Sequence, residues 1–320
     1  MTIIGKDIKK AIDFLKKGEL VAIPTETVYG LAANALEEKS VKKIFEAKER
    51  PFFNPLIIHT NSLEKINEYV EELPEKAVNL IKNFSPGPIT FVLKKTKKIP
   101  DIVTGGNDTV AIRIPKHDLT LSLLSELDFP LAAPSANPFG FISPTKAIHV
   151  FEQLNKKVSY ILDGGDCEVG LESTIIYFGE KTPKILRFGG IEVEKIEAII
   201  GKVNILEKIE KNIIAPGQLK SHYAPKHKFI ITDIDKFLLE TDINKNNIGI
   251  LSFNKKYDSI PISNQIILSK ESNLNEAGSK LFDSLRELDK LNVEIIVSEI
   301  FPNIGIGKAI NDRLKRASSS

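Results

Sequence analysis

Short apolar segments alternate with amphipathic segments along the first 200 residues, and this alternation constrains the fold more than any other feature of the sequence. The apolar segments are bounded by Gly, Pro or polar residues, as buried strands are. The segments between them repeat apolar residues every three or four positions, as helices packed on a sheet do. The pattern predicts an α/β protein, and hairpin-like stretches near 160–188 predict some antiparallel pairing.

Capping and breaking residues define the expected elements further. Asp7 can cap the first helix, which Gly18 ends, and Ser143-Pro144 is typical of an N-cap with proline at the first helical position. We expect strands at 20–23, 56–59, 89–93, 110–114, 130–133, 160–162, 173–177 and 185–188. We expect helices at 7–17, 38–48, from Ser62, at 74–84, from Asp118, at 143–153 and at 192–200.

The pattern changes after residue 205. Two Pro-containing turns, Ala215-Pro216-Gly217 and Ala224-Pro225, bracket a polar stretch that is typical of a linker. Beyond it we expect strands at 229–232, 248–251 and 293–298 and helices at 274–291 and 306–316. A chain of 320 residues has room for two domains. The sequence therefore predicts a first domain at 1–205, a linker at 206–228 and a small Rossmann-like α/β domain at 229–320.

Composition excludes several classes of protein. The formal net charge is only +2, so the surface as a whole is not a polybasic surface for binding nucleic acid. No apolar run is long enough to span a bilayer, and the N-terminus lacks the apolar core of a signal peptide. Cys167 is the only cysteine, which excludes an intramolecular disulfide framework and a cysteine-based zinc finger. We expect a cytoplasmic protein in which Cys167 lies in a turn and has no functional role.

Arginine is scarce, and its positions are informative. Basic residues are mostly Lys, and only three of the six arginines lie in the first 228 residues: Arg50, Arg113 and Arg187. Each stands in a polar, Gly- or Pro-rich segment at the end of an expected strand. One such arginine is as well explained by a surface salt bridge, but three together, with Lys48, suit a polyphosphate or a carboxylate. No P-loop and no dinucleotide fingerprint accompanies them.

Hydroxyl and amide side chains occur in the same segments. They are Thr27, Asn54, Thr109, Ser135, Asn137, Ser143 and Ser173. In open α/β sheets ligands bind beyond strand ends, so these groups suit phosphate, ribose or an amino-acid head group. Each one alone is equally well a cap or a turn residue. The period of two places Thr109, Ala111 and Arg113 on one side of their strand.

An ordered set of segments resembles the YrdC-like family. The segments are GELVAIPTETVYGLAANA, KERPFFNPLIIH, SPGPITFVLK, TVAIRIP, PLAAPSANPFGFISPT, GLESTII and ILRFGGI. The tail, with APGQLKSHYAPKHKF and GIGKAINDRLKRAS, is similar to the long, two-domain threonylcarbamoyl-AMP synthases of that family. The resemblance implies a twisted, mixed open sheet with flanking helices, followed by the smaller Rossmann-like domain.

The resemblance also implies a reaction. Members of this family convert L-threonine, bicarbonate or CO2, and ATP into threonylcarbamoyl-AMP and pyrophosphate. This is the first step of threonylcarbamoyladenosine formation at position 37 of tRNAs that read ANN codons, and a threonylcarbamoyl transferase machinery acts downstream. Mg2+ is expected through the ATP phosphates rather than on protein ligands. Weak contact with tRNA is an open possibility.

The family pattern assigns roles to residues of this chain. The catalytic K-x-R and S-x-N tetrad falls on Lys48, Arg50, Ser135 and Asn137. The ATP-binding set is Arg50, Asn54, Thr109, Ser135, Ser143, Arg187 and Tyr223. The threonine-binding set is Thr27, His59, Arg113, the backbone near Ala133, and Ser173. The linker at 206–228 would fold over the site as a lid, although Gln218–Ser221 departs from a common family form.

Some assignments stay open. No general base is evident, and Glu26 and Glu172 are expected either to be solvated or to hold Mg2+ through water. Without the resemblance, His59 is more typical of a packing residue. An RNA-binding module is one alternative, which the low net charge disfavours. Another is the carbamoyl transfer of hydrogenase-maturation proteins, whose acylphosphatase and zinc-finger regions we do not expect here. A non-enzymatic adaptor role for 229–320 is compatible with the synthase hypothesis.

Overall fold

The computed structural model describes residues 1–206, 213–217 and 223–319, which fall into two compact units. The first unit comprises Met1–Phe139, Ser143–Glu168 and Glu172–Leu219. The second comprises Lys220–Ser320 together with two short segments from earlier in the chain, Gly140–Ile142 and Val169–Leu171. Much of the predicted lid, at 207–212 and 218–222, lies outside the described residues.

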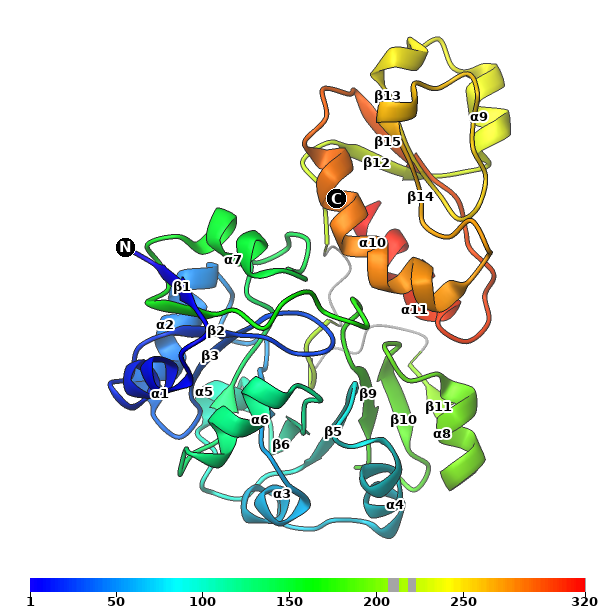
Figure 1. Ribbon diagram of the computed structural model, residues 1–320. Coiled ribbons are helices and arrows are strands. Elements are labelled where there is room, and N and C mark those ends of the chain that lie inside the picture. Colours follow the sequence, from blue (N-terminus) through cyan, green and yellow to red (C-terminus); the bar gives the residue numbers. More distant parts are fainter. Residues whose placement is uncertain (207–212, 218–222, 320) are drawn as a thin grey trace. The chain divides into compact units, whose positions relative to one another are not determined.

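The first unit is built on a mixed sheet (Figure 1). Its strands are β1 (Ile3–Gly5), β2 (Val21–Ile23), β3 (Gly30–Asn34), β4 (Ile57–His59), β5 (Ile89–Lys94), β6 (Thr109–Arg113), β7 (Leu131–Ala132), β8 (Tyr160–Leu162), β9 (Thr174–Tyr177), β10 (Lys184–Arg187) and β11 (Asn204–Ile205). Among the described residues their order is β1-β8-β2-β3-β7-β4-β6-β5-β9-β10-β11. β9 and β10 are antiparallel, which confirms the antiparallel pairing predicted within 160–188, but β8 in the same stretch is parallel to both of its neighbours.

Helices cover both faces of this sheet. They are α1 (Ile8–Lys16), α2 (Glu38–Lys48), α3 (Leu63–Tyr69), α4 (Glu75–Phe84), α5 (Asp101–Thr104), α6 (Asp118–Ser125), α7 (Ala147–Leu154) and α8 (Val193–Ile200). The main core packs α2, α4, α7 and α8 against one face. A second core packs α1 and α6 against part of the other face, over β2, β7 and β8.

Two local differences from the sequence-based expectations have physical causes. The Gly-Leu-Ala-Ala-Asn run of β3 lacks the alternation of a typical strand, yet it pairs with β2. Its Gly30 lies close to the residue that follows β7, because a Cβ built there would lie 3.2 Å from Cβ of Ala133. The expected helix at 143–153 begins only at Ala147. The Ser143 hydroxyl donates to Glu172 (2.7 Å) instead of capping a helix.

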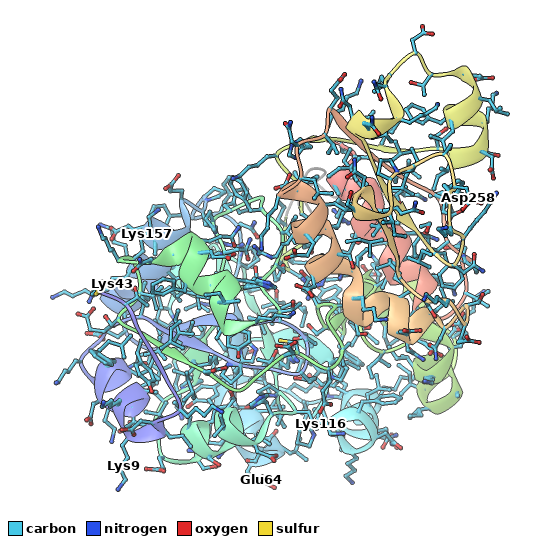
Figure 2. All side chains as sticks on the ribbon, turned by 45° about the horizontal axis from the view of Figure 1, so that its top comes forward. Lys9, Lys43, Glu64, Lys116, Lys157 and Asp258 are labelled. Atoms are coloured by element: carbon cyan, nitrogen blue, oxygen red, sulfur yellow. The ribbon has the colours of Figure 1, made fainter. Side chains whose placement is uncertain are left out.

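Other predicted boundaries agree more closely. Asp7 caps α1 by accepting a hydrogen bond from the backbone N–H of Lys10 (3.2 Å), and Gly18 follows the helix with φ of 70°. The strands β1, β3 and β11 and the short helix α5 were not predicted, because runs of two to five residues carry little periodicity. Charged side chains cover the outside of the unit, and Lys9, Lys43, Glu64 and Lys157 extend away from its core in Figure 2.

The second unit contains a fully parallel sheet with order β12-β15-β13-β14. Its elements are β12 (Lys228–Ile231), α9 (Ile234–Glu240), β13 (Ile248–Ser252), β14 (Gln265–Ile267), α10 (Leu274–Asp289), β15 (Ile295–Ser298) and α11 (Gly307–Ala317), with 3-10 turns at 245–247 and 262–264. This is the small Rossmann-like domain that the sequence predicts, with α9 and β14 added. Within the unit, Ala224 N–H donates to the carbonyl of Gly140 (3.1 Å), and Arg286 donates to that of Ile142.

Candidate active site

The polar face of the first sheet is produced by strand alternation. On β6, Val110 and Ile112 enter the main core, whereas Thr109, Ala111 and Arg113 point to the opposite face, as predicted from the period of two. The parallel register pairs His59 of β4 with Arg113 of β6. The central strands therefore place two predicted threonine ligands next to each other, although 53 residues separate them in the sequence.

Arg113 is the centre of the first cluster. Its side chain is 5% exposed, its Nε donates to the carbonyl of Gly87 (3.2 Å), and its Nη1 donates to Oγ1 of Thr27 (2.9 Å). Its Nη2 lies 2.7 Å from Oε2 of Glu26, whose side chain is 3% exposed. Glu26 is therefore buried and ion-paired, so the expectation that it is solvated was wrong. The sequence could not show its partner, which lies 87 positions away.

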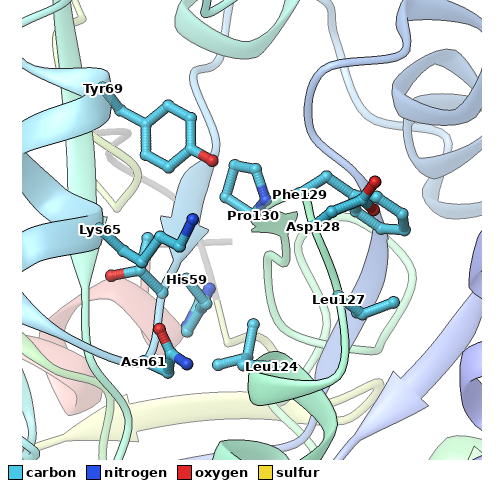
Figure 3. Close-up of a pocket in the computed structure, with 10 residues that line it drawn as sticks. His59, Asn61, Lys65, Tyr69, Leu124, Leu127, Asp128, Phe129 and Pro130 are labelled. Atoms are coloured by element: carbon cyan, nitrogen blue, oxygen red, sulfur yellow. The ribbon is translucent and has the colours of Figure 1, made fainter.

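His59 lies at the edge of this cluster and borders a small pocket. Burial, and secondarily the nearby charge of Arg113, lowers the pKa of His59 to about 3, so its imidazole is neutral at physiological pH. Figure 3 shows His59 between Lys65 and Tyr69 of α3 and Leu124 of α6. The cavity volume is about 10 Å³, which is room for no more than about one water molecule. It is too small to be the threonine site by itself.

Lys48 is the centre of a second cluster, in which it contacts the loop at 135–137. It ends α2, its side chain is buried, and its ammonium donates to the carbonyls of Ser135 and Asn137. Burial, and then the charge of Arg50, lowers the pKa of Lys48 well below its ordinary value. The α2 helix thereby holds the 135–137 loop, which is the structural basis for the predicted pairing of the K-x-R and S-x-N motifs.

Arg50 follows α2 after a left-handed residue, Glu49 (φ 56°). Its Nη2 donates to Oδ1 of Asn54 (2.6 Å) and to the carbonyl of Pro55 (2.8 Å), and its guanidinium lies 5.8 Å from the ring centre of Phe139. These contacts orient a guanidinium that is only 7% exposed. Arg50 and Asn54, both predicted ATP ligands, are therefore in direct contact.

Ser173 and Arg187 form a third cluster. Nε and Nη2 of Arg187 both donate to the carbonyl of Ser173 (3.1 and 3.0 Å), and the Ser173 hydroxyl shares a hydrogen bond with Thr90 (2.7 Å). The strand register explains the contact, because β9 pairs with both β5 and β10. A Cβ on Gly217 would lie 2.8 Å from Cδ of Arg187, so this position of the linker favours glycine.

The remaining predicted residues divide between the units. Thr109 is 8% exposed at the start of β6, and Ala133 uses its amide in the sheet by donating to Ile57 (2.9 Å). Ser143 binds Glu172, which is 6% exposed, so this carboxylate is not solvated either. Tyr223 belongs to the second unit, where its ring stacks on Phe282 with centroids 5.3 Å apart. Its predicted contact with the nucleotide stays a prediction.

Four buried cations of the first unit, each in contact with carbonyl, hydroxyl or amide oxygens, are an arrangement that suits the binding of anionic ligands. The family model described as "Telomere recombination" (Sua5/YciO/YrdC) matches residues 13–189. The model described as "Threonylcarbamoyl-AMP synthase, C-terminal domain" matches residues 191–319. The chain belongs to the Sua5/YciO/YrdC family, in its form with this C-terminal domain.

Similar proteins extend over nearly the whole chain. The threonylcarbamoyl-AMP synthase of Pyrococcus abyssi is 40% identical, with 97% of this chain and 94% of that protein aligned. The threonylcarbamoyl-AMP synthase of Bacillus subtilis is 39% identical, with 97% and 92% aligned. The crystal structure of Pyrococcus abyssi Sua5 complexed with L-threonine matches with a TM-score of 0.92 at 38% identity, and covers 100% of this chain and 98% of that one.

Proposed function

We propose that this chain is an enzyme that makes threonylcarbamoyl-AMP and pyrophosphate from L-threonine, bicarbonate or CO2, and ATP. The observation that carries the proposal is the set of four cations, Lys48, Arg50, Arg113 and Arg187, each at most 7% exposed on the first unit. Buried cations are expensive unless they are paired with polar groups or anions. The relatives with full-length similarity are named for this activity.

Threonine binding is assigned to the Arg113 cluster. A guanidinium can hold a carboxylate through two parallel hydrogen bonds. Nη2 of Arg113 makes no hydrogen bond of good geometry within the described residues, so it keeps donors for such a ligand. The neutral imidazole of His59 beside it adds no second charge that would compete for the carboxylate.

Adenylyl transfer then needs positioning and charge neutralisation rather than a protein nucleophile. The threonine nitrogen, as a free amine, bonds to the carbon of CO2 and releases one proton to solvent, which gives a carbamate. A carbamate oxygen attacks the α-phosphorus of ATP, the bond to the bridging oxygen breaks, and pyrophosphate leaves. Lys48, Arg50 and Arg187 are assigned to hold the phosphates and to stabilise the charge that develops on them.

Mg2+ is assigned to ATP rather than to a protein cage. Over residues 1–206, 213–217 and 223–319 no group of three or more His, Cys, Asp or Glu side chains is placed to hold a metal ion. Glu172, in one of the polar loops, accepts a hydrogen bond from the Ser143 hydroxyl (2.7 Å). Phosphate oxygens and water are ordinary Mg2+ ligands, and the bound ion would neutralise phosphate charge.

The surroundings of the reaction are assigned by the same reasoning. The linker at 206–228 would act as a lid, with Tyr223 reaching the nucleotide, because carbamates lose CO2 in water and a closed site protects them. The product would pass to a transferase that modifies tRNA. Within the described part of the chain, no helix is long and apolar enough to cross a membrane.

Pyrophosphate release tests the proposal. The purified protein is given ATP and Mg2+, with and without L-threonine and bicarbonate, and we expect release only when all four are present. Arg50→Ala should abolish it, whereas Lys42→Ala, which removes an exposed cation on the same helix as Lys48, should not. Threonine-independent release, or none from folded protein, would contradict the proposal. Salt-sensitive RNA binding without turnover would favour the RNA-binding alternative.

A further inference from the structure

Glu26 has no role in the reaction as described so far, yet its position is unusual. Its side chain is 3% exposed, and neither carboxylate oxygen accepts a hydrogen bond of good geometry from any described residue. Among the described residues, its charge partner is Nη2 of Arg113, at 2.7 Å. A buried carboxylate without hydrogen-bond donors is costly, and such groups are rare unless a ligand supplies the donors.

The backbone around Glu26 is held firmly, so the carboxylate is aimed rather than loose. Oγ1 of Thr25 accepts from the backbone N–H of Thr27 (3.1 Å) and of Val28 (3.2 Å), and it donates to the carbonyl of Val28 (2.7 Å). Thr27 is in turn bound by Nη1 of Arg113 (2.9 Å). The turn therefore fixes the backbone next to Glu26, and its Thr27 contacts the same guanidinium as Glu26 does.

An α-amino acid matches this pair of opposite charges. Its carboxylate and its ammonium group are attached to the same carbon, so a site that holds both needs a cation and an anion close together. Arg113 supplies the cation with unused Nη2 donors, and Glu26 supplies the anion with unused acceptors 2.7 Å away. An ammonium group has three N–H donors, and the Glu26 oxygens could accept hydrogen bonds from them.

We infer that Glu26 binds the α-ammonium group of threonine while Arg113 binds its carboxylate. This inference rests on the proposed function and names the group that recognises an amino acid as such. It makes Glu26 the residue that discriminates threonine from the corresponding hydroxy acid, in which a hydroxyl replaces the ammonium group. A site built to bind a charged donor rejects an analogue that lacks it, because the buried carboxylate is then left unpaired.

Binding measurements test the inference. Calorimetry with L-threonine and with 2,3-dihydroxybutyrate gives two affinities for the wild type, for Glu26→Gln and for the exposed control Glu64→Gln. We expect the wild type and the control to prefer threonine by about tenfold or more, and Glu26→Gln to lose most of this preference by weakening threonine alone. Equal loss of both ligands, or an unchanged preference, would overturn the assignment.

A second variant covers a failure of Glu26→Gln to fold, since it leaves Arg113 buried without its charge partner. Glu26→Asp keeps the charge but withdraws it by one methylene, so it should weaken threonine and leave the hydroxy acid unaffected. Equal weakening of both ligands would overturn the assignment here too. The proposed function and the role of Glu26 can fail separately. Wild-type protein that binds no threonine contradicts both. If threonine-dependent pyrophosphate release is intact but the variants still prefer threonine over the hydroxy acid, only the role of Glu26 is contradicted.

Discussion

Acidification should destabilise this protein through His59, and the size of the effect follows from its buried position. In the unfolded chain His59 titrates near 6.5, whereas burial and the charge of Arg113 lower its pKa to about 3 in the folded chain. Between these values the unfolded chain binds a proton that the folded chain excludes. Stability therefore falls as the pH drops through this window, by about 1.4 kcal/mol per pH unit.

The perturbation is His59→Gln, which replaces the imidazole with a non-titrating amide of similar size. Relative to about pH 7, the contribution of His59 at about pH 4.5 is a loss of about 2 to 3 kcal/mol in the free energy of unfolding. The variant should lack this part of the pH dependence, whatever its stability at neutral pH. The groups that line the same pocket, Lys65, Tyr69 and Asp128, remain in both proteins.

Urea unfolding followed by circular dichroism at the two pH values measures the difference. Asn61→Ala is the matched control, because it removes a non-titrating side chain from the same pocket and its hydrogen bond to Ser125 (3.1 Å). It should change stability equally at both pH values. If His59→Gln and the wild type lose the same free energy on acidification, His59 is not excluded from protonation by the fold, and the reasoning is wrong.

Three further substitutions test other contacts. Lys48→Met leaves two carbonyls of the 135–137 loop without their charged donor, so we expect a loss of about 2 to 4 kcal/mol in urea unfolding and loss of pyrophosphate release. Arg187→Lys cannot reproduce the two-nitrogen contact with Ser173, and it should raise the KM for ATP about tenfold or more in steady-state kinetics; an unchanged KM would exclude Arg187 from the ATP site. Asn311→Ala removes the two buried hydrogen bonds between the side chain of this α11 residue and the backbone of Phe301. It should lower stability by about 1 to 3 kcal/mol, with a lower midpoint of thermal unfolding of the second unit.

Much of the fold was predictable because it depends on local pattern. The capping of α1 by Asp7 and the alternation along β6 both follow from residues that are close in sequence. The prediction failed where a distant residue decided the outcome. Ser143 has the sequence of a helix cap, but Glu172 takes its hydroxyl, and the helix begins four residues later.

The site residues likewise include some that the sequence identified and some contacts that it could not. Sequence alone identified the polar segments and the three arginines, because these residue types are uncommon in a Lys-rich chain and stand at strand ends. It could not identify the ion pair of Glu26 with Arg113, since nothing in the PTETVYG segment indicates which distant cation faces the carboxylate. It likewise left open whether Glu172 is solvated.

What the sequence determined by itself, then, is the inventory: strands and helices in alternation, two units, and a family whose motifs occur in order. Which side chains touch was decided only by the tertiary structure, because β4 and β6 bring His59 beside Arg113, β9 and β10 bring Ser173 onto Arg187, and the turn after β2 places Glu26 at 2.7 Å from a guanidinium. The physical reason is that burial strengthens the effect of each contact on charge and protonation. Out of water, charge pairs and neutral imidazoles depend on their immediate neighbours, and strand register selects those neighbours.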